Sequence, residues 1–206
     1  MIVTELAVFS QDRYKVFIDQ EFAFVLYKGE LRQYNLSAGQ ALSEKDYEEI
    51  IHTVLPKRAK LRAMNLLQKK RYTEKQLKDK LKEGLYPQEI IEEAIAYVKS
   101  FRYLDDLQFA VDYITYHETS KSERIMMGDL LQKGIDREVI TQAFAAWRAL
   151  GGSQNEQEMI REILKKKHYS FDCEAKEKQK IYAFLLRKGF SVENVNKVLG
   201  GLDSFA

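Results

Sequence analysis

Few residues of this chain have the type and spacing needed for acid–base or metal chemistry. Asp105 and Asp106 are adjacent carboxylates, a residue type that serves in pairs for proton transfer or for binding a divalent cation. They also stand directly before a helical pattern, where an aspartate accepts hydrogen bonds from free backbone N–H groups and is favoured by the helix dipole. We therefore interpret this pair as a helix start.

The other candidate residues are isolated. The histidines His52, His117 and His168 have no second His or Cys at the spacing of metal ligands. Cys173 is the only cysteine, and we expect a half-buried helix residue there rather than a catalytic thiol. The sequence contains no glycine-rich phosphate loop and no nucleophile motif. It therefore predicts no enzyme activity, no metal and no cofactor.

Lysine and arginine are the side chains from which we expect function. The formal net charge is only +2, yet charge is segregated along the chain. Residues 56–82 contain eleven Lys or Arg against two Asp or Glu, and residues 161–188 contain nine against four. Residues 1–55 and 83–160 are acidic, with five against nine and seven against fourteen. Such a surface fits a partner with both signs of charge, for example a nucleoprotein filament.

The cations of the two basic segments are the predicted contact residues. Helix-end cations and solvated faces explain part of them, but an excess of nine positive charges within residues 56–82 is better explained by phosphate contact. Lysine and arginine gain affinity there because they release counterions condensed on nucleic acid. The predicted contact residues, which include two from the middle of the chain, are Lys57, Arg58, Lys60, Arg62, Lys69, Lys70, Arg71, Lys78, Lys82, Arg124, Lys133, Lys165, Lys166, Lys167, Arg187 and Lys188.

Three similar stretches must position these cations. Residues 77–95, 129–144 and 184–199 each read as the end of an amphipathic helix, a glycine, an apolar residue, a short turn and a second helix. The three glycines are 50 and 55 residues apart, a period typical of repeats that stack on one another. We align Leu81 with Leu131 and Leu186; Gly84 with Gly134 and Gly189; Leu85 with Ile135 and Phe190; and Ile90 with Ile140 and Val195.

Each of these glycines is expected to end a helix. Only glycine adopts the left-handed conformation without a Cβ clash, and the apolar residue after it folds back on the last turn. The next helix then begins at Pro87, Asp136 or Ser191, which are residue types favoured at helix starts.

The first 34 residues are not helical in pattern. Short β-branched and aromatic runs alternate with turn residues, which predicts an antiparallel sheet of three strands or, if residues 31–34 follow a turn at 28–30, of four. A helix capped by Ser43 runs to about Thr53, and we expect Pro56 to separate it from the repeats.

The predicted fold is mainly α. Three tandem three-helix repeats form an elongated, curved array behind a small antiparallel β-sheet and one helix, with parts at 1–55, 56–104, 105–152 and 153–206. The expected repeat helices are 57–70, one capped by Thr73, and 88–100; one from Asp105, 123–132 and 137–150; and 157–167, 174–188 and 192–199.

Several tracts of the sequence resemble one protein family. Residues 103–110 (YLDDLQFA), 124–126 (RIM) and 131–135 (LQKGI) are similar to the signature of the RecX family of bacterial recombination regulators. Residues 71–74 (RYTE) and 186–191 (LRKGFS) also look like RecX, so the resemblance covers most of the chain. The chain departs from the family where Lys121-Ser122-Glu123 stands in place of the usual glycine and proline.

The resemblance implies a function that the residue patterns alone do not. It implies a non-enzymatic modulator of RecA that binds in the groove of the RecA–DNA filament and limits strand exchange, ATPase and coprotease activity in recombination and the SOS response. DNA would be contacted through its phosphates without sequence preference.

The residues by themselves leave two other functions open: a DNA- or RNA-binding helical module, and a protein-only helical scaffold. One cysteine and the lack of any apolar run of about twenty residues lead us to expect a cytoplasmic protein without membrane association. We expect a monomer.

Overall fold

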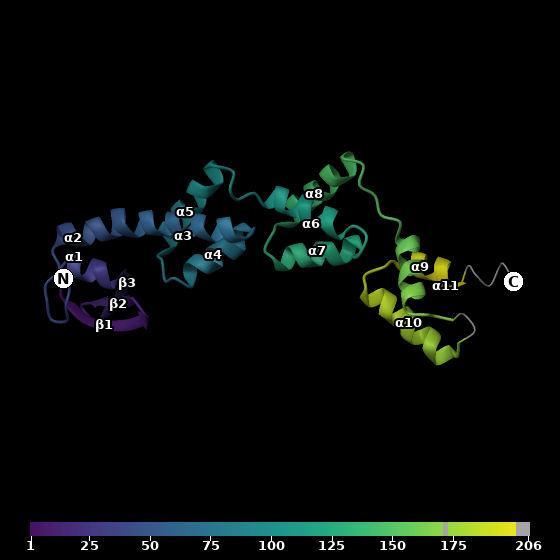
Figure 1. Cartoon of the computed structure of the whole chain (residues 1–206), viewed down its shortest axis with the longest axis horizontal. Helices are drawn as coiled ribbons and strands as arrows, with labels where there is room; N and C mark the ends of the chain where they lie inside the picture. Colours follow the sequence, from purple (N-terminus) through teal and green to yellow (C-terminus); the bar gives the residue numbers. More distant parts are fainter. Residues whose placement is uncertain (171–172, 201–206) are drawn as a thin grey trace. The chain divides into compact units, whose positions relative to one another are not determined.

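The computed structural model describes residues 1–170 and 173–200, and the chain divides into two compact units, Met1–Asp105 and Asp106–Ala206. The first unit contains the sheet and the first repeat, and the second unit contains the other two repeats (Figure 1). No helix in the described part of the chain is long and apolar enough to span a bilayer.

The N-terminal sheet has three antiparallel strands, β1 (Val3–Ser10), β2 (Arg13–Ile18) and β3 (Glu21–Tyr27), in the order β1-β2-β3. The alternative fourth strand at 31–34 is wrong, because helix α1 (Lys28–Gln33) occupies these residues. The Tyr27 backbone N–H donates to Glu30 Oε2 at 2.7 Å, so a local hydrogen bond starts the helix where a turn was expected.

The helix that follows Ser43 does not stop before Pro56. Helix α2 (Glu44–Glu49) leads into a π-helical turn, η1 (Ile50–Val54), and then into α3 (Leu55–Lys69). The Leu55 N–H bonds to the Ile50 carbonyl, five residues back. Pro56, which has no N–H to donate, stands directly after this wider turn, in the first turn of α3.

The sheet and the first repeat share one hydrophobic core. Helices α4 (Glu74–Lys82) and α5 (Gln88–Ser100) complete this repeat. Val16 and Phe24 of the sheet belong to the same buried cluster as Ala59 of α3 and Ile91 of α5, and each of the four is 0 % exposed. The sheet is therefore part of the first unit's core, although it lies outside the repeat pattern.

The second unit contains α6 (Asp106–His117), α7 (Glu123–Gln132) and α8 (Arg137–Ala149), then α9 (Glu156–Lys166), α10 (Ala175–Arg187) and α11 (Val192–Gly200). Each set of three encloses its own core, one around Trp147 and one around Phe190. The repeat helices expected from the sequence are confirmed with bounds within about two residues. The four-part division of the chain stays a prediction.

The expected helix stop is confirmed in the second and third repeats. Gly134 and Gly189 have φ angles of +84° and +82°. The residues after them, Ile135 and Phe190, are buried, and their N–H groups donate to carbonyls five residues earlier at 3.1 and 3.3 Å. This is the bond pattern of a Schellman stop.

The first repeat uses a different residue at this position. Leu85, not Gly84, takes the left-handed conformation there, with a φ of +58°. The repeat alignment proposed above is therefore wrong by one residue at this point. The fully buried leucines that correspond are Leu81, Leu130 and Leu185, and the leucines aligned from the sequence, Leu131 and Leu186, lie one position later.

Glycine is required at position 84 for a reason other than its backbone angle. A Cβ added to it would lie 2.9 Å from Cε2 of the Tyr86 ring, which is closer than such atoms pack. Glycine here lets the ring lie against the backbone, and this placement of Tyr86 shapes the cleft described below.

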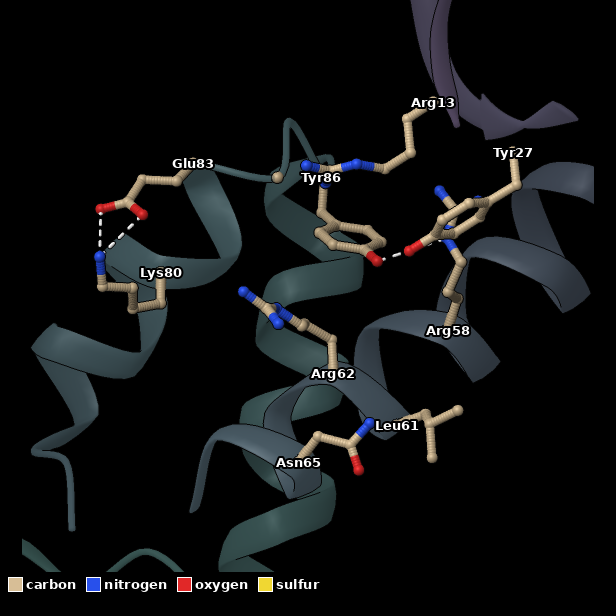
Figure 2. A pocket seen from close by; sticks show the side chains of 10 residues that line it. Arg13, Tyr27, Arg58, Leu61, Arg62, Asn65, Lys80, Glu83 and Tyr86 are labelled. Atoms are coloured by element: carbon tan, nitrogen blue, oxygen red, sulfur yellow. Dashed lines mark hydrogen bonds and ion pairs between the residues drawn. The ribbon is translucent and has the colours of Figure 1, made fainter. Parts of the chain in front are cut away.

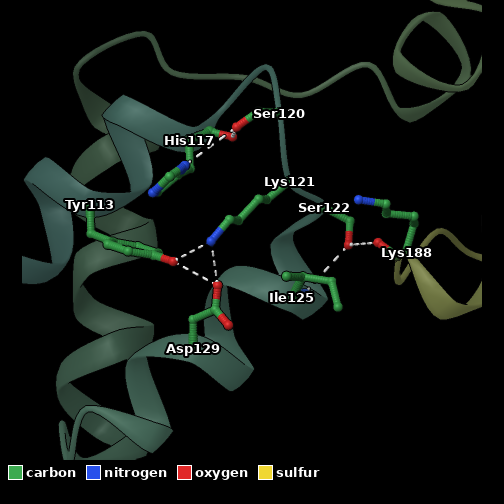
Figure 3. Close-up of polar contacts among 8 residues, drawn as sticks. All are labelled: Tyr113, His117, Ser120, Lys121, Ser122, Ile125, Asp129 and Lys188. Carbon is green, nitrogen blue, oxygen red and sulfur yellow. Dashed lines mark hydrogen bonds and ion pairs between the residues drawn. The ribbon is translucent and has the colours of Figure 1, made fainter. Parts of the chain in front are cut away.

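Ser122 joins the second and third repeats. Its side chain is buried at the N-terminus of α7, accepts a hydrogen bond from the Ile125 N–H at 3.4 Å and donates to the Lys188 carbonyl at 2.9 Å (Figure 3). A Cβ on Gly189 would lie 2.4 Å from Ser122 Oγ. Gly189 is thus required both by its backbone angle and by this close approach.

We expect Gly189→Ala to lower the free energy of unfolding by about 2 kcal/mol or more, because a Cβ in the left-handed region alone costs about 1–2 kcal/mol. Thermal unfolding followed by circular dichroism measures the change. Gly128→Ala is the matched control, since Gly128 lies inside α7 and a Cβ added there would have no atom within 4 Å. It should raise stability by up to about 1 kcal/mol. Equal melting of the two variants would contradict this role of Gly189.

Candidate anion-binding surfaces

Arg58, one of the predicted contact residues, is held inside the first unit. Its Nη1 donates to Glu30 Oε2 at 2.6 Å, its Nη2 to the Val25 carbonyl, and its Nε to the Tyr86 hydroxyl at 3.3 Å. Its side chain is only 14 % exposed, and the guanidinium lies 4.9 Å from the centre of the Tyr27 ring. Arg58 therefore links α3 to β3, to α1 and to the loop before α5.

We expect Arg58→Met to lower the free energy of unfolding by about 3 kcal/mol, because it removes the positive charge that balances the Glu30 carboxylate and the donor to the Val25 carbonyl. Urea unfolding followed by circular dichroism tests this. Lys57→Met is the control, because Lys57 is the exposed neighbour on the same helix. An Arg58→Met protein as stable as the control would show that this contact contributes little.

Two other predicted cations are also neutralised within the first unit. Lys60 Nζ lies 2.6 Å from Glu93 Oε1 of α5, and Lys78 Nζ lies 2.6 Å from Glu74 Oε1 one turn earlier on α4. Burial would raise the pKa of the Glu74 carboxyl, but hydrogen bonds from Lys78 and Lys99 outweigh burial and the pKa is lowered. Lys60 thus joins α3 to α5, whereas the Lys78 pair lies within α4. Because both lysines are already paired with carboxylates, they attract an external anion less strongly.

The remaining cations of this segment are exposed. Lys69, Lys70 and Arg71 lie at the end of α3 and form what we call the α3-end cluster. Lys70 Nζ lies 4.6 Å from the centre of the Tyr72 ring. The other exposed cations that were predicted as contact residues are Lys57, Arg62 and Lys82.

A cleft of about 420 Å³ lies between the sheet and the first repeat, and we call it the arginine cleft (Figure 2). Arg13, the first residue of β2, faces it from the sheet, and Arg58 and Arg62 face it from α3. Tyr27, Leu61, Asn65, Lys80, Glu83, Gly84 and Tyr86 complete its lining. Sequence reasoning missed Arg13, because it stands in an acidic segment and only the packing of the sheet on α3 brings it here.

Two of the four cations in the arginine cleft are balanced by carboxylates. Arg58 pairs with Glu30, and Lys80 Nζ lies 2.8 Å from Glu83 Oε1. The hydrogen bond to Glu83, followed by its charge, raises the pKa of the Lys80 ammonium. Arg13 Nε donates to Ser10 Oγ at 2.9 Å. In the part of the chain that the structure describes, neither Arg13 nor Arg62 has a carboxylate partner.

A second basic hollow lies in the third repeat, and we call it the Phe184 groove. It measures about 670 Å³ and is lined by Lys166, Lys167, Tyr169, Glu177, Lys180, Ile181, Phe184 and Arg187. Nζ of Lys167 and of Lys188 lie 4.4 and 5.8 Å from the centre of the Phe184 ring. The structure thus brings together the two cation groups predicted in this repeat, at the ends of α9 and α10.

Phe184 and Lys180 were not among the predicted contact residues. They are four residues apart on α10, and Arg187 follows three residues later, so the three share one face of the helix. That spacing is visible in the sequence and was the signal that could have found them. A ring between cations is typical of surfaces that bind single-stranded nucleic acid by stacking on bases.

The middle repeat contains two of the predicted contact residues, Arg124 and Lys133. Arg124 is exposed, but Lys133 Nζ lies 5.6 Å from the centre of the Tyr113 ring. Beside it, Lys121 Nζ donates to the Tyr113 hydroxyl and to Asp129 Oδ2, both at 2.7 Å, and the same hydroxyl donates to Asp129 at 2.6 Å (Figure 3). This network joins α6 to α7 and is a structural use of charge.

The network, together with burial, shifts the pKa values of Asp129, Tyr113 and the neighbouring His117. Burial would raise the pKa of the Asp129 carboxyl, but hydrogen bonds from Lys121 and Tyr113 outweigh burial and lower it. Burial, and then the hydrogen bond to Asp129, raise the pKa of the Tyr113 hydroxyl. Burial, followed by the charge of Lys121, lowers the pKa of the His117 imidazole.

We expect Asp129→Asn to destabilise the second unit at pH 7. Because the carboxyl pKa is lower in the folded state, its stabilisation is complete above the unfolded value of about 4 and is lost as the pH falls through the folded value. The difference between wild type and variant should therefore narrow below about pH 4. Urea unfolding followed by the fluorescence of Trp147, the only tryptophan, measures it at each pH. A difference independent of pH would contradict the assignment.

The residues considered for acid–base, metal or thiol chemistry, Asp105, Asp106 and Cys173, lie at or just before the starts of helices. Helix α6 begins at Asp106, which confirms the helix-start interpretation of Asp105 and Asp106. Cys173 is half-buried as expected, but it precedes α10 by two residues and is not helical. Among the described residues, no three His, Cys, Asp or Glu side chains come together in a way that could hold a metal ion.

The fold and these surfaces define a protein built from three-helix repeats in which most of the predicted contact cations lie in two basic regions. Models of two RecX domains match the chain: the first three-helix domain at residues 59–98 and the third at 154–199. The chain is 32 % identical over 188 residues to "Regulatory protein RecX" of Caldanaerobacter subterraneus subsp. tengcongensis, covering 91 % of this chain and 92 % of that protein. It is 30 % identical to the Bacillus velezensis protein of the same name, covering 91 % and 72 %. The chain belongs to the RecX family of regulatory proteins.

Solved structures support the fold. A crystal structure of regulatory protein RecX aligns with a TM-score of 0.63 at 24 % identity, covering 96 % of this chain and 98 % of the other. RecX from Lactobacillus salivarius aligns with a TM-score of 0.61 at 23 % identity, covering 73 % and 97 %. The family models and the relatives confirm the resemblance found in the sequence. The solved structures support the mainly helical fold behind a small sheet.

Proposed function

We propose that this chain regulates homologous recombination and the SOS response by binding the RecA–DNA filament and inhibiting RecA. Membership of the RecX family supports this proposal. The observation that carries it is the grouping of exposed cations at the α3-end cluster and around the Phe184 groove. Such side chains gain free energy from phosphate contact because bound counterions are released.

The proposed mechanism is occlusion. The basic regions hold the phosphate backbone of the filament DNA, and the acidic segment, residues 83–160, contacts the recombinase. A helical-repeat body seated in the filament groove blocks entry of a second DNA strand and addition of subunits. Strand exchange, DNA-dependent ATPase and coprotease activity all decrease as a result. The protein acts as a cytoplasmic monomer and performs no chemistry of its own.

A second function is favoured by the Phe184 groove alone. An aromatic ring flanked by lysines binds single strands through stacking and phosphate contact without a protein partner. On this alternative the chain is a nucleic-acid-binding module, and any effect on recombination follows from covering DNA.

An ATPase titration separates the two functions. We expect the protein to lower the DNA-dependent ATPase of RecA from the same bacterium at or below one molecule per recombinase subunit. The inhibition should persist when excess naked DNA is added, because the filament itself is the target. Inhibition that disappears with competitor DNA would favour the simple nucleic-acid binder.

The α3-end cluster is tested by reversing its charge. The triple variant Lys69→Glu, Lys70→Glu and Arg71→Glu should need about tenfold more protein for half-inhibition, because it loses phosphate contacts. The matched control reverses three exposed cations outside the predicted set, Lys28→Glu, Arg32→Glu and Lys45→Glu, and changes the net charge equally. Both variants should keep the helical circular dichroism signal. Equal loss in both would show that total charge, and not this cluster, sets binding.

A further inference from the structure

The arginine cleft of the first unit carries positive charge that the protein does not balance. We propose that it binds a phosphomonoester, the terminal phosphate of a nucleotide or of a nucleic-acid strand. This goes beyond the proposed function, because it concerns a discrete site on the isolated protein and needs no recombinase. The cleft volume of about 420 Å³ lies within the range of small-ligand sites, about 300–1,000 Å³.

The charge of the cleft matches a dianion. The pairs Arg58–Glu30 and Lys80–Glu83 are each neutral, and Arg13 and Arg62 remain, with no carboxylate partner in the described part of the chain. A phosphomonoester carries about −1.5 to −2 at neutral pH, whereas a phosphodiester within a strand carries about −1. Two unbalanced guanidinium groups therefore favour a terminal phosphate over an internal one.

The positions of these arginines suit phosphate recognition. Arg13 extends from β2 and Arg62 from α3, so they approach the hollow from different elements (Figure 2). A guanidinium binds phosphate through two parallel N–H donors, which a lysine cannot do. Arg13 is held in place by its bond to Ser10 and by the Phe9 ring, 4.8 Å from the guanidinium carbon.

The wall of the cleft is organised in advance. Arg58 is fixed by Glu30, by the Val25 carbonyl and by the hydroxyl of Tyr86, so it does not move to meet a ligand. That hydroxyl accepts from Arg58 and keeps its own proton, which is available for a phosphate oxygen. Prior fixing of such donors lowers the entropy lost on binding.

Tyr27 points to a nucleotide rather than to phosphate alone. Its side chain lines the cleft and is 42 % exposed. An exposed aromatic ring beside a phosphate site can stack on a base, a contact worth about 1–3 kcal/mol. The same phosphate chemistry could come from a free nucleoside monophosphate or from the 5′ end of a strand, and the experiment distinguishes them.

The test compares two short oligothymidylates that differ only in a 5′-phosphate, each labelled at the 3′ end, by fluorescence anisotropy with the full-length protein. We expect the phosphorylated strand to bind at least about tenfold more tightly, the difference that about 1.4 kcal/mol produces. Arg62→Gln and Arg13→Gln should each reduce the ratio to about one. Arg62 is exposed and has no carboxylate partner in the described residues, so its substitution should leave folding intact.

Arg32→Gln is the matched control, because it removes the same charge from an exposed position of the first unit outside the cleft. It should keep the preference for the phosphorylated strand. Calorimetry with thymidine monophosphate and with inorganic phosphate forms the second arm. Binding of the mononucleotide that is lost in Arg62→Gln, with no strand preference, supports the site and assigns it to free nucleotides.

Two results would overturn the proposal. One is equal affinity for the two strands together with no heat from the mononucleotide or inorganic phosphate. The other is a phosphate preference that survives in both Arg62→Gln and Arg13→Gln. Neither result bears on inhibition of the recombinase, which is measured in a separate assay, so the failure of one proposal is distinguishable from the failure of the other.

Discussion

The first unit depends on one partly buried guanidinium. Removing the charge of Arg58 from water is unfavourable unless its donors are paired, and here they are paired with Glu30, a β3 carbonyl and the Tyr86 hydroxyl. These partners come from separate elements, so the requirement to satisfy one side chain fixes the sheet, α1, α3 and the loop before α5 against each other. The arginine cleft exists because this contact holds its walls in place while Gly84 lets the Tyr86 ring lie close to the backbone.

The second unit consists of two small repeats, and different contacts hold them together. A core of three short helices buries little surface by itself, so neighbouring repeats must contact each other to be stable. Here Ser122 caps α7 and also donates to the carbonyl before Gly189, so one hydroxyl begins a helix of one repeat and fixes the next repeat against it. The family resemblance leads us to expect glycine and proline in this stretch, and in this chain a capping serine orders it instead.

Local signals in the sequence were enough for most of the fold. Helix starts such as Ser43 and Thr73, and stops such as Gly134 and Gly189, depend on bonds within about six residues, and these predictions are confirmed. Predictions failed where a distant or unusual contact decided the backbone. A π turn carries the helix through Pro56, and the left-handed residue of the first repeat is a leucine. The packing of the sheet against α3 places Arg13 in the lining of the cleft, and no local pattern in the sequence could show this contact.

Some cations that form the basic segments of the sequence are paired with carboxylates in the fold. This reduces the number of residues that are candidates for binding an external anion. Residues 56–82 have an excess of nine positive charges, but carboxylates from outside that segment, such as Glu30, Glu83 and Glu93, neutralise several of them. A cation paired inside the protein has already lost its counterions, so it gains little more from a phosphate. The cations that still attract mobile counterions are the exposed ones. The affinity of this protein for a polyanion should therefore follow the exposed α3-end cluster and the Phe184 groove rather than the number of lysines and arginines in the sequence.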